Sequence, residues 1–216
     1  MRSLVSALCA FLYISCTLAS FNVPVYFNVL YDQKNQTDGG ITDATLSQQI
    51  QVLNHFFGPI GLGFSVAGVR RVPVPYQVLH EWAPGNDAAR SIQQQRVGNA
   101  QTLNIYTVAP SSVYSGYSAS YPQDYNSDPR ADGILFPYDY LPGGTASEYN
   151  TGTMLVQAVG QWSGLYPTSY GGCEGGDFVD DTPAEATPAT GCPEGRDTCP
   201  GAGLDPVHNM MDSTTE

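Results

Sequence analysis

One nearly apolar segment limits the possible folds most strongly. Residues 151–165 read TGTMLVQAVGQWSGL, a helix-length run with no charged side chain. A helix that is apolar on every side must be buried, so the rest of the chain has to enclose it. Gln157 and Gln161 lie four positions apart and therefore share one face of that helix. On residue chemistry alone, they are two buried amides that form hydrogen bonds with neighbouring loops.

The remainder of the chain alternates between strand and helix patterns. Alternating apolar residues indicate strands at 22–31, around 64–72, at 102–108 and within 133–144, and helical spacing indicates helices within 42–58, at 87–97 and at 151–165. Thr42 or Asp43 is expected to cap the first helix, which Gly58 and Pro59 end. Residues 109–132 are expected to form a long loop or irregular edge, and periodicity disappears after Tyr166. These patterns favour an α+β or α/β domain with an open sheet.

The N-terminus has the layout of a secretory signal peptide. Arg2 precedes an apolar stretch that ends in small residues, so cleavage is expected after Ala19. The alternative is a membrane anchor, but the apolar run is too short to span a bilayer comfortably. We therefore expect a signal peptide at 1–19 and one secreted domain at 20–216, composed of an N-terminal subdomain (20–165) and an irregular C-terminal subdomain (166–216). In a secreted protein, Asn35 of the Asn-Gln-Thr sequon is a candidate glycosylation site.

Charge and cysteine content narrow the classes of partner. The chain has 20 acidic and 8 basic residues, for a net charge of -12. Such a surface repels phosphate backbones, so nucleic acid is not an expected partner. A monomer without membrane contact is expected as well. After removal of the signal peptide three cysteines remain, Cys173, Cys192 and Cys199. An odd number in a secreted protein indicates a lone thiol, an intermolecular bridge or a missing partner.

Four stretches of the C-terminal half carry a family resemblance. They read YNTGTMLVQAVGQWSGLYPTSYGGC, GDFVDDTPAE, GCPEGRDTC and GLDPVHNMMD. With GYSASYP and DGILFPYDYLPGG upstream, they closely resemble the secreted pappalysin-type (cytophagalysin) zinc metalloproteases, a metzincin family, and especially its fungal extracellular members. The resemblance covers nearly all of the mature chain and is densest from Gly116 to Asp212. It implies an α+β, metzincin-like zincin fold: an open twisted mixed sheet with an edge strand, two to three helices and a small irregular C-terminal lobe.

The resemblance assigns the two glutamines to the positions of metal ligands. In that family the helix carries the pattern HExxHxxGxxH, in which three histidines bind zinc and the glutamate takes a proton from zinc-bound water. In this sequence the histidine positions hold Gln157, Gln161 and Pro167, the glutamate position holds Ala158, and Gly164 is retained. Amide oxygen is not among the usual zinc donors, proline has no side-chain donor, and alanine accepts no proton. We therefore expect no intact metal ligand, no catalytic base and no bound zinc.

The resemblance also implies features of the C-terminal lobe. Met211 corresponds to the Met-turn methionine, and Ser213 stands where the family usually has tyrosine. The family pairs its first cysteine with its third, which implies a Cys173–Cys199 disulfide. Family members continue to a further cysteine and a C-terminal helix, so the lobe is expected to be truncated and Cys192 to be the odd cysteine.

Two other groups of residues bear on metals. Asp177, Asp180 and Asp181 lie where family members can hold calcium, and they offer the hard oxygen donors that calcium prefers. The alternative is a solvated acidic loop. The three histidines, which lie in the first helix (55), in a loop (80) and before Met211 (208), show no spacing that suggests a shared metal, so packing or surface roles are expected.

Three functional hypotheses follow. The first is a secreted, catalytically inactive relative that binds peptides or an active homologue through a retained groove. The second is an active extracellular zinc metalloprotease that digests protein substrates, which is the family default. The third is a decaying gene product whose shortened C-terminal lobe barely folds. Bound zinc and chelator-sensitive cleavage of casein separate the first two.

Overall fold

The protein is built around a five-stranded sheet, seen in a computed structural model that describes residues 21–201 and 203–212. The strand order is β2-β1-β3-β5-β4, and all neighbours are parallel except the edge strand β4, which is antiparallel to β5. The strands are β1 (Phe21–Asp32), β2 (Leu62–Val74), β3 (Leu103–Val108), β4 (Ser118–Ala119) and β5 (Ile134–Pro137). The expected signal peptide lies outside the described residues.

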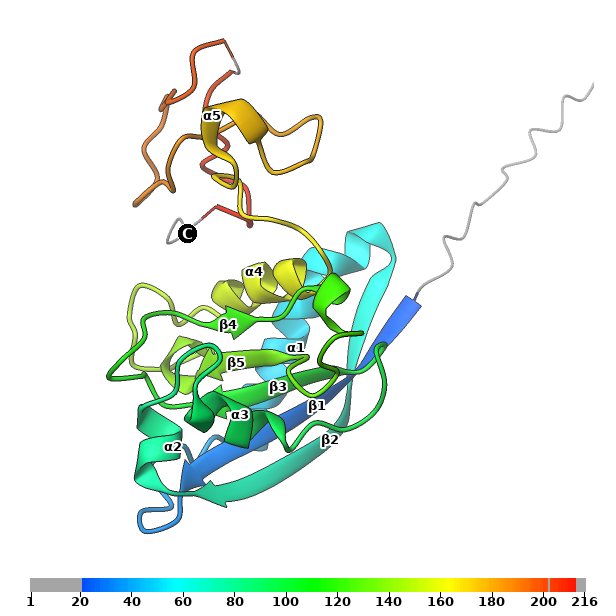
Figure 1. Cartoon of the computed structure of the whole chain (residues 1–216), viewed down its shortest axis with the longest axis vertical. Helices are drawn as coiled ribbons and strands as arrows, with labels where there is room; N and C mark the ends of the chain where they lie inside the picture. The colour runs from blue at the N-terminus through cyan, green and yellow to red at the C-terminus, as the bar shows by residue number, and fades with distance from the viewer. Residues whose placement is uncertain (1–20, 202, 213–216) are drawn as a thin grey trace, which may run out of the picture.

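Helices cover both faces of this sheet (Figure 1). The covering helices are α1 (Asp43–Phe57), α2 (Tyr76–His80), α3 (Asp87–Gln93) and α4 (Thr153–Trp162). The single turn α5 (Gly172–Gly175) lies in the C-terminal segment, and the 3-10 turns are η1 (Gly58–Ile60), η2 (Pro122–Asp124) and η3 (Tyr138–Tyr140). The mixed α+β architecture expected from the sequence is confirmed. Two short helices, α2 and α5, were not predicted, and α4 is shorter at both ends than the expected 151–165.

The first face carries the larger core. Alternate residues of β1, including Val25, Phe27 and Val29, are fully buried against α1 and α4. Thr42 caps α1 by accepting a hydrogen bond from the backbone N–H of Thr45, as the sequence predicts, and the helix ends at Gly58. The nearly apolar α4 is thereby enclosed between the sheet and the C-terminal segment.

The opposite face is covered by α2 and α3. Trp82, which is fully buried there, donates its indole N–H to the backbone oxygen of Ala109 at 2.8 Å. His80 was expected in a loop but is the last residue of α2, and its Nε2 lies 2.7 Å from Oδ2 of Asp38. The Trp82 hydrogen bond therefore holds the loop that follows β3 and leads to the edge strand.

The C-terminal segment lies beyond α4 (Figure 1, orange to red) and is mostly irregular. The predicted Cys173–Cys199 disulfide is confirmed. Arg196 joins two carboxylates that are buried in the same segment: it pairs with Glu185, and its Nη1 lies 3.0 Å from Oδ2 of Asp205. Covalent and ionic links therefore hold a segment that has little regular structure.

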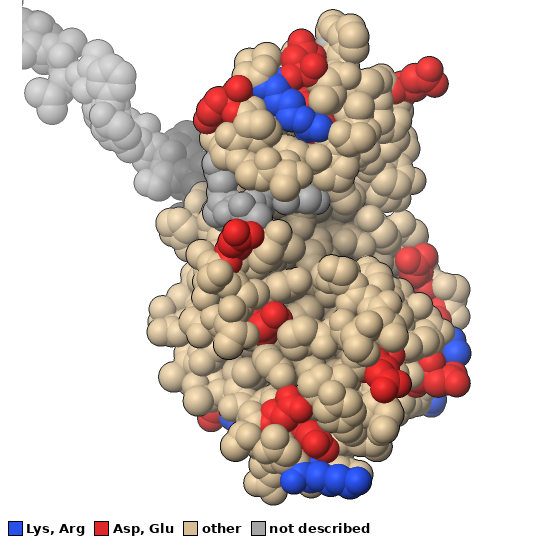
Figure 2. All heavy atoms as spheres, turned by 90° about the vertical axis from the view of Figure 1, so that its left-hand side faces the viewer, with Lys and Arg blue, Asp and Glu red and all other residues tan. Residues whose placement is uncertain are grey.

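The acidic side chains are dispersed over the surface rather than gathered into one patch on the face shown in Figure 2. No helix among the described residues has the length and apolar character that crossing a membrane requires.

Candidate functional site: the groove beside helix α4

Helix α4 carries the two glutamines one turn apart, Gln157 at its middle and Gln161 near its C-terminal end. Gly164, with φ of 107°, turns the chain away from the helix in a backbone conformation that favours glycine. The backbone N–H of Leu165 then bonds to the carbonyl of Gly160 at 3.0 Å. This tight turn returns the chain toward the helix and brings Pro167 to the cavity that Gln157 and Gln161 also line.

Gln157 connects the helix to the C-terminal segment. Its side chain is buried, and its Nε2 donates to the backbone oxygen of Asp212 at 2.8 Å. The neighbouring Met211 packs on Gly160 so closely that a Cβ at that glycine would lie 2.5 Å from the methionine sulfur. The backbone N–H of Thr168 also bonds to the oxygen of Met211, at 3.2 Å. The turn at Met211 is therefore fixed to α4 by packing and by the Gln157 hydrogen bond, and to the segment after α4 by the Thr168 hydrogen bond.

Gln161 connects the same helix to the edge strand. Its Nε2 donates to the backbone oxygen of Ala119 in β4 at 3.0 Å. Ser120 bonds inward, because its N–H donates to the oxygen of Gly133 beside β5. In an antiparallel pair the adjacent residue points its backbone groups the other way, so the carbonyl of Ala119 faces outward. Gln161 thus forms a hydrogen bond with an outward-facing backbone carbonyl at the edge of the sheet.

The three predicted ligand positions converge on one cavity of about 470 Å³. Its lining also includes Ser118 and Ala119 of β4, together with Tyr117 and Met154. Burial raises the pKa of Tyr117 above its usual range, so its hydroxyl stays protonated at any physiological pH. Ala158 is fully buried and contributes no polar group.

This donor set does not fit a zinc ion. Two neutral amides and a pyrrolidine ring offer none of the imidazole, thiolate or carboxylate donors that zinc uses. Both amide nitrogens already donate to backbone carbonyls, which orients the glutamine side chains toward β4 and Asp212. The arrangement is instead that of two polar bridges between a helix and its neighbours. The expectation of buried amides bonded to loops holds for Gln157, whereas Gln161 is half-buried and bonds to strand β4.

The remaining predicted site residues lie elsewhere. Asp177 is buried and its Oδ1 accepts from the backbone N–H of Val179 at 3.0 Å, whereas Asp180 and Asp181 are exposed. Among the described residues these three carboxylates do not converge as a cluster of ligand atoms, and calcium binding stays a prediction. Asn35 is exposed, and Thr37 of the sequon donates its hydroxyl to Oδ1 of Asn35 at 2.7 Å. Glycosylation also stays a prediction.

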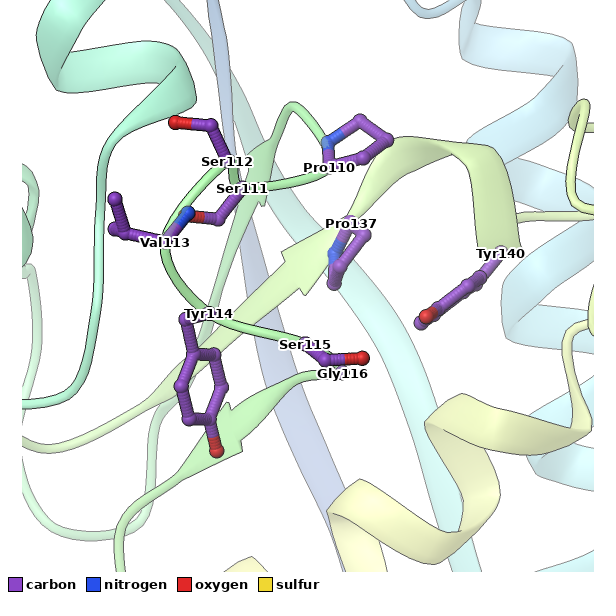
Figure 3. A pocket seen from close by; sticks show the side chains of 9 residues that line it. All are labelled: Pro110, Ser111, Ser112, Val113, Tyr114, Ser115, Gly116, Pro137 and Tyr140. Carbon is purple, nitrogen blue, oxygen red and sulfur yellow. The ribbon is translucent and has the colours of Figure 1, made fainter.

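A second cavity, of about 400 Å³, lies where β3 and β5 end (Figure 3). It is lined by the 110–116 loop with Pro137 and Tyr140. The hydroxyls of Ser111 and Ser112 donate to the backbone oxygens of Trp82 and His80. This cavity includes none of the site residues predicted from the sequence.

Two polar clusters were missed by sequence reasoning. Asp132 is buried and accepts hydrogen bonds from Arg96, Trp162 and Ser120, which fixes the edge strand and the end of α4. In the C-terminal segment, His208 lies between Cys192 and Glu194. His208 is exposed, in line with the packing or surface role expected from the sequence, but the spacing did not reveal these two neighbours.

Comparisons with known proteins agree on one family. No family model matches the chain. The "Extracellular metalloprotease" of Sordaria macrospora is 38% identical over 199 residues, which cover 90% of this chain and 68% of that protein. The "Extracellular metalloprotease 1" of Coccidioides posadasii is 35% identical over 204 residues, covering 92% and 71%. Both names support the expected extracellular location.

The fold also matches solved structures. Mature mirolysin of Tannerella forsythia, solved in complex with a cleaved peptide, superposes with a TM-score of 0.76. The match covers 91% of this chain and 85% of mirolysin at 23% sequence identity, so it supports the fold and not the chemistry.

Proposed function

This chain belongs to the extracellular metalloprotease family, and we propose that it is a member that has lost zinc-dependent hydrolysis and keeps a groove for extended peptides. The proposal rests on one observation: the two glutamines at the ligand positions of α4 both serve as hydrogen-bond bridges, to Asp212 and to Ala119. Both glutamines therefore act as structural links. A glutamine amide carries no charge, and its oxygen is not among the donors that zinc favours.

The chain also lacks the residue that would accept a proton during hydrolysis. A metal in such a site supplies a nucleophilic hydroxide and polarises the peptide carbonyl. The position of the base holds Ala158, whose side chain is buried and has no acceptor. Since general acid–base catalysis contributes about 10²–10⁴-fold by itself, losing both metal and base leaves no route to measurable hydrolysis by this mechanism.

The first prediction concerns metal content and cleavage. We expect purified protein to release no casein fragments that a chelator suppresses, and to carry no metal at α4. The matched comparison is the variant Gln157→His, Ala158→Glu, Gln161→His, Pro167→His, which restores the three imidazoles and the carboxylate and should gain one zinc per chain by atomic absorption. Chelator-sensitive cleavage by the unaltered chain would instead support an active protease.

The peptide-binding part of the proposal rests on the edge strand. β4 ends the sheet, and an extended peptide can add to such an edge through main-chain hydrogen bonds. The cavity beside Ser118 and Ala119 supplies apolar contacts from Tyr117 and Met154. The net charge of -12 favours peptides that carry lysine or arginine. In this chain, however, Gln161 competes with any such peptide for the outward oxygen of Ala119.

The second prediction uses that competition. Gln161→Ala should increase the affinity for fluorescent peptides from a casein digest by about 5-fold, the equivalent of one hydrogen bond of about 1 kcal/mol. Fluorescence anisotropy measures the affinity, and Gln51→Ala, an exposed glutamine of α1, is the control that should leave it unchanged. Equal affinities for the Gln161→Ala and Gln51→Ala variants, or no binding by any form, would contradict the assignment of the groove.

A further inference from the structure

Four aromatic rings form a cluster on the surface beside the groove. The aromatic cluster consists of Tyr121, Tyr166, Tyr170 and Phe178. The ring centroid of Tyr166 lies 5.0 Å from that of Tyr121 and 4.3 Å from that of Tyr170. The ring of Phe178 lies 5.6 Å from that of Tyr166 and 5.8 Å from that of Tyr170. None of the four belongs to either buried core, so the cluster is not part of the packing that holds the sheet.

The cluster begins where the edge strand ends. Tyr121 follows Ala119, the last residue of β4, by two positions, which is about 7 Å in extended chain. Tyr166 directly precedes Pro167, and Pro167 and Ala119 both line the groove. A peptide that pairs with β4 and continues past Ala119 therefore meets the ring pair of Tyr121 and Tyr166 within about two residues.

Phe178 is held outward by an unfavourable backbone conformation. Its φ is 66°, and it is the one described residue other than glycine with a positive φ. Such a conformation is a steric outlier for a bulky side chain. Oδ1 of the buried Asp177 accepts from the backbone N–H of Val179 at 3.0 Å and so closes the turn around it. Because the Phe178 side chain is 73% exposed, burial offsets little of this strain, and strained residues of this kind cluster at binding sites.

The surroundings of the cluster are apolar as well. Leu165 and Val179, which follow α4 and Phe178, are 43% and 37% exposed, and Tyr170 is 44% exposed. Exposed apolar residues that gather in one place mark an interaction site. We propose that the aromatic cluster binds an aromatic side chain, such as phenylalanine, of a peptide that lies in the groove. This inference rests on the proposed function and names the side chain that the groove selects.

The packing of the rings favours an aromatic guest over a cation. The interplanar angles of Tyr166 with Tyr121 and Tyr170 are 30° and 34°, so the faces of Tyr166 are turned toward its two neighbours. A cation binds over a ring face, which is the part of Tyr166 that these neighbours occupy. Ring edges carry the positive end of the quadrupole and prefer the face of another aromatic ring.

Fluorescence anisotropy with synthetic octapeptides tests the proposal. Each peptide contains one lysine and otherwise serine, threonine and valine, and phenylalanine or asparagine is placed at each position in turn. We expect phenylalanine at one position to bind about 2- to 10-fold more tightly than asparagine there, the range of an aromatic pair. Phe178→Asn should abolish this preference. Phe21→Asn, which alters an exposed phenylalanine of β1, should preserve it, because β3 and β5 separate β1 from β4.

Urea denaturation separates binding from a structural role. Asparagine adopts a positive φ more readily than phenylalanine does, so Phe178→Asn should not lower the midpoint of unfolding. The proposal is overturned if phenylalanine and asparagine peptides bind equally, if Phe178→Asn keeps the preference, or if arginine at the same position gives the same gain. Peptide binding without a preference for phenylalanine would leave the groove in place, whereas no binding by any octapeptide would overturn the groove and this inference together.

Discussion

Asp132→Ala is expected to lower the free energy of unfolding by about 3–5 kcal/mol, the cost of leaving a buried charge without its partner. The Asp132 side chain is 4% exposed and that of Arg96 is 7% exposed, and Nη2 of Arg96 lies 2.6 Å from Oδ2 of Asp132. The other carboxylate oxygen accepts from Nε1 of Trp162 at 2.8 Å and from Oγ of Ser120 at 3.1 Å. One side chain therefore links the loop after α3, the end of α4 and the edge strand.

Urea denaturation followed by tryptophan fluorescence measures this loss. Asp124→Ala removes an exposed aspartate nearby and should change stability by less than about 0.5 kcal/mol. Adding Arg96→Met to Asp132→Ala should recover only the part of the loss that comes from the unpaired charge, because the guanidinium also donates to the backbone oxygens of Gly98 and Asn99. A single variant as stable as the Asp124→Ala control would show that the pair is not a structural centre of the fold.

Local patterns predicted the elements that depend on nearby residues. The alternation in β1 and the Thr42 cap of α1 are readable because their causes lie within a few positions. The unpredicted α2 is only five residues long and has no apolar repeat, so its helix depends on the buried contacts of Leu79. β2 extends beyond the expected 64–72 because it pairs with β1 along its length, a long-range property.

The site could be predicted only in part for the same reason. Helical spacing placed Gln157 and Gln161 on one face, and family resemblance named the positions they occupy. Their acceptors, Asp212 and Ala119, lie 55 and 42 residues away and follow no periodic rule. His208 likewise lies 16 residues from Cys192 in a segment of turns, where spacing does not reveal proximity.

The second large effect is expected in that segment. Arg196→Met leaves the carboxylates of Glu185 and Asp205, both fully buried, without their shared guanidinium. Breaking a buried pair by removing one partner costs about 3–5 kcal/mol. Urea denaturation at neutral pH, with the Cys173–Cys199 disulfide intact, measures this loss. Arg90→Met, which breaks an exposed ion pair with Asp87, is the control and should cost less than about 1 kcal/mol.

The pH dependence of the Arg196→Met variant identifies the cause. Burial raises the pKa of Glu185, while Thr168 and Arg196 act in the opposite direction. A carboxyl whose pKa is higher in the folded state binds its proton more tightly there, so stability is greatest below the ordinary value of 4.5 and falls as the pH rises toward the folded pKa. Without Arg196 the pKa of Glu185 rises further, so the variant should lose more stability than the unaltered chain between pH 4.5 and pH 7. If both proteins lose the same amount over that interval, Arg196 does not compensate the buried charge, and the defect comes from packing.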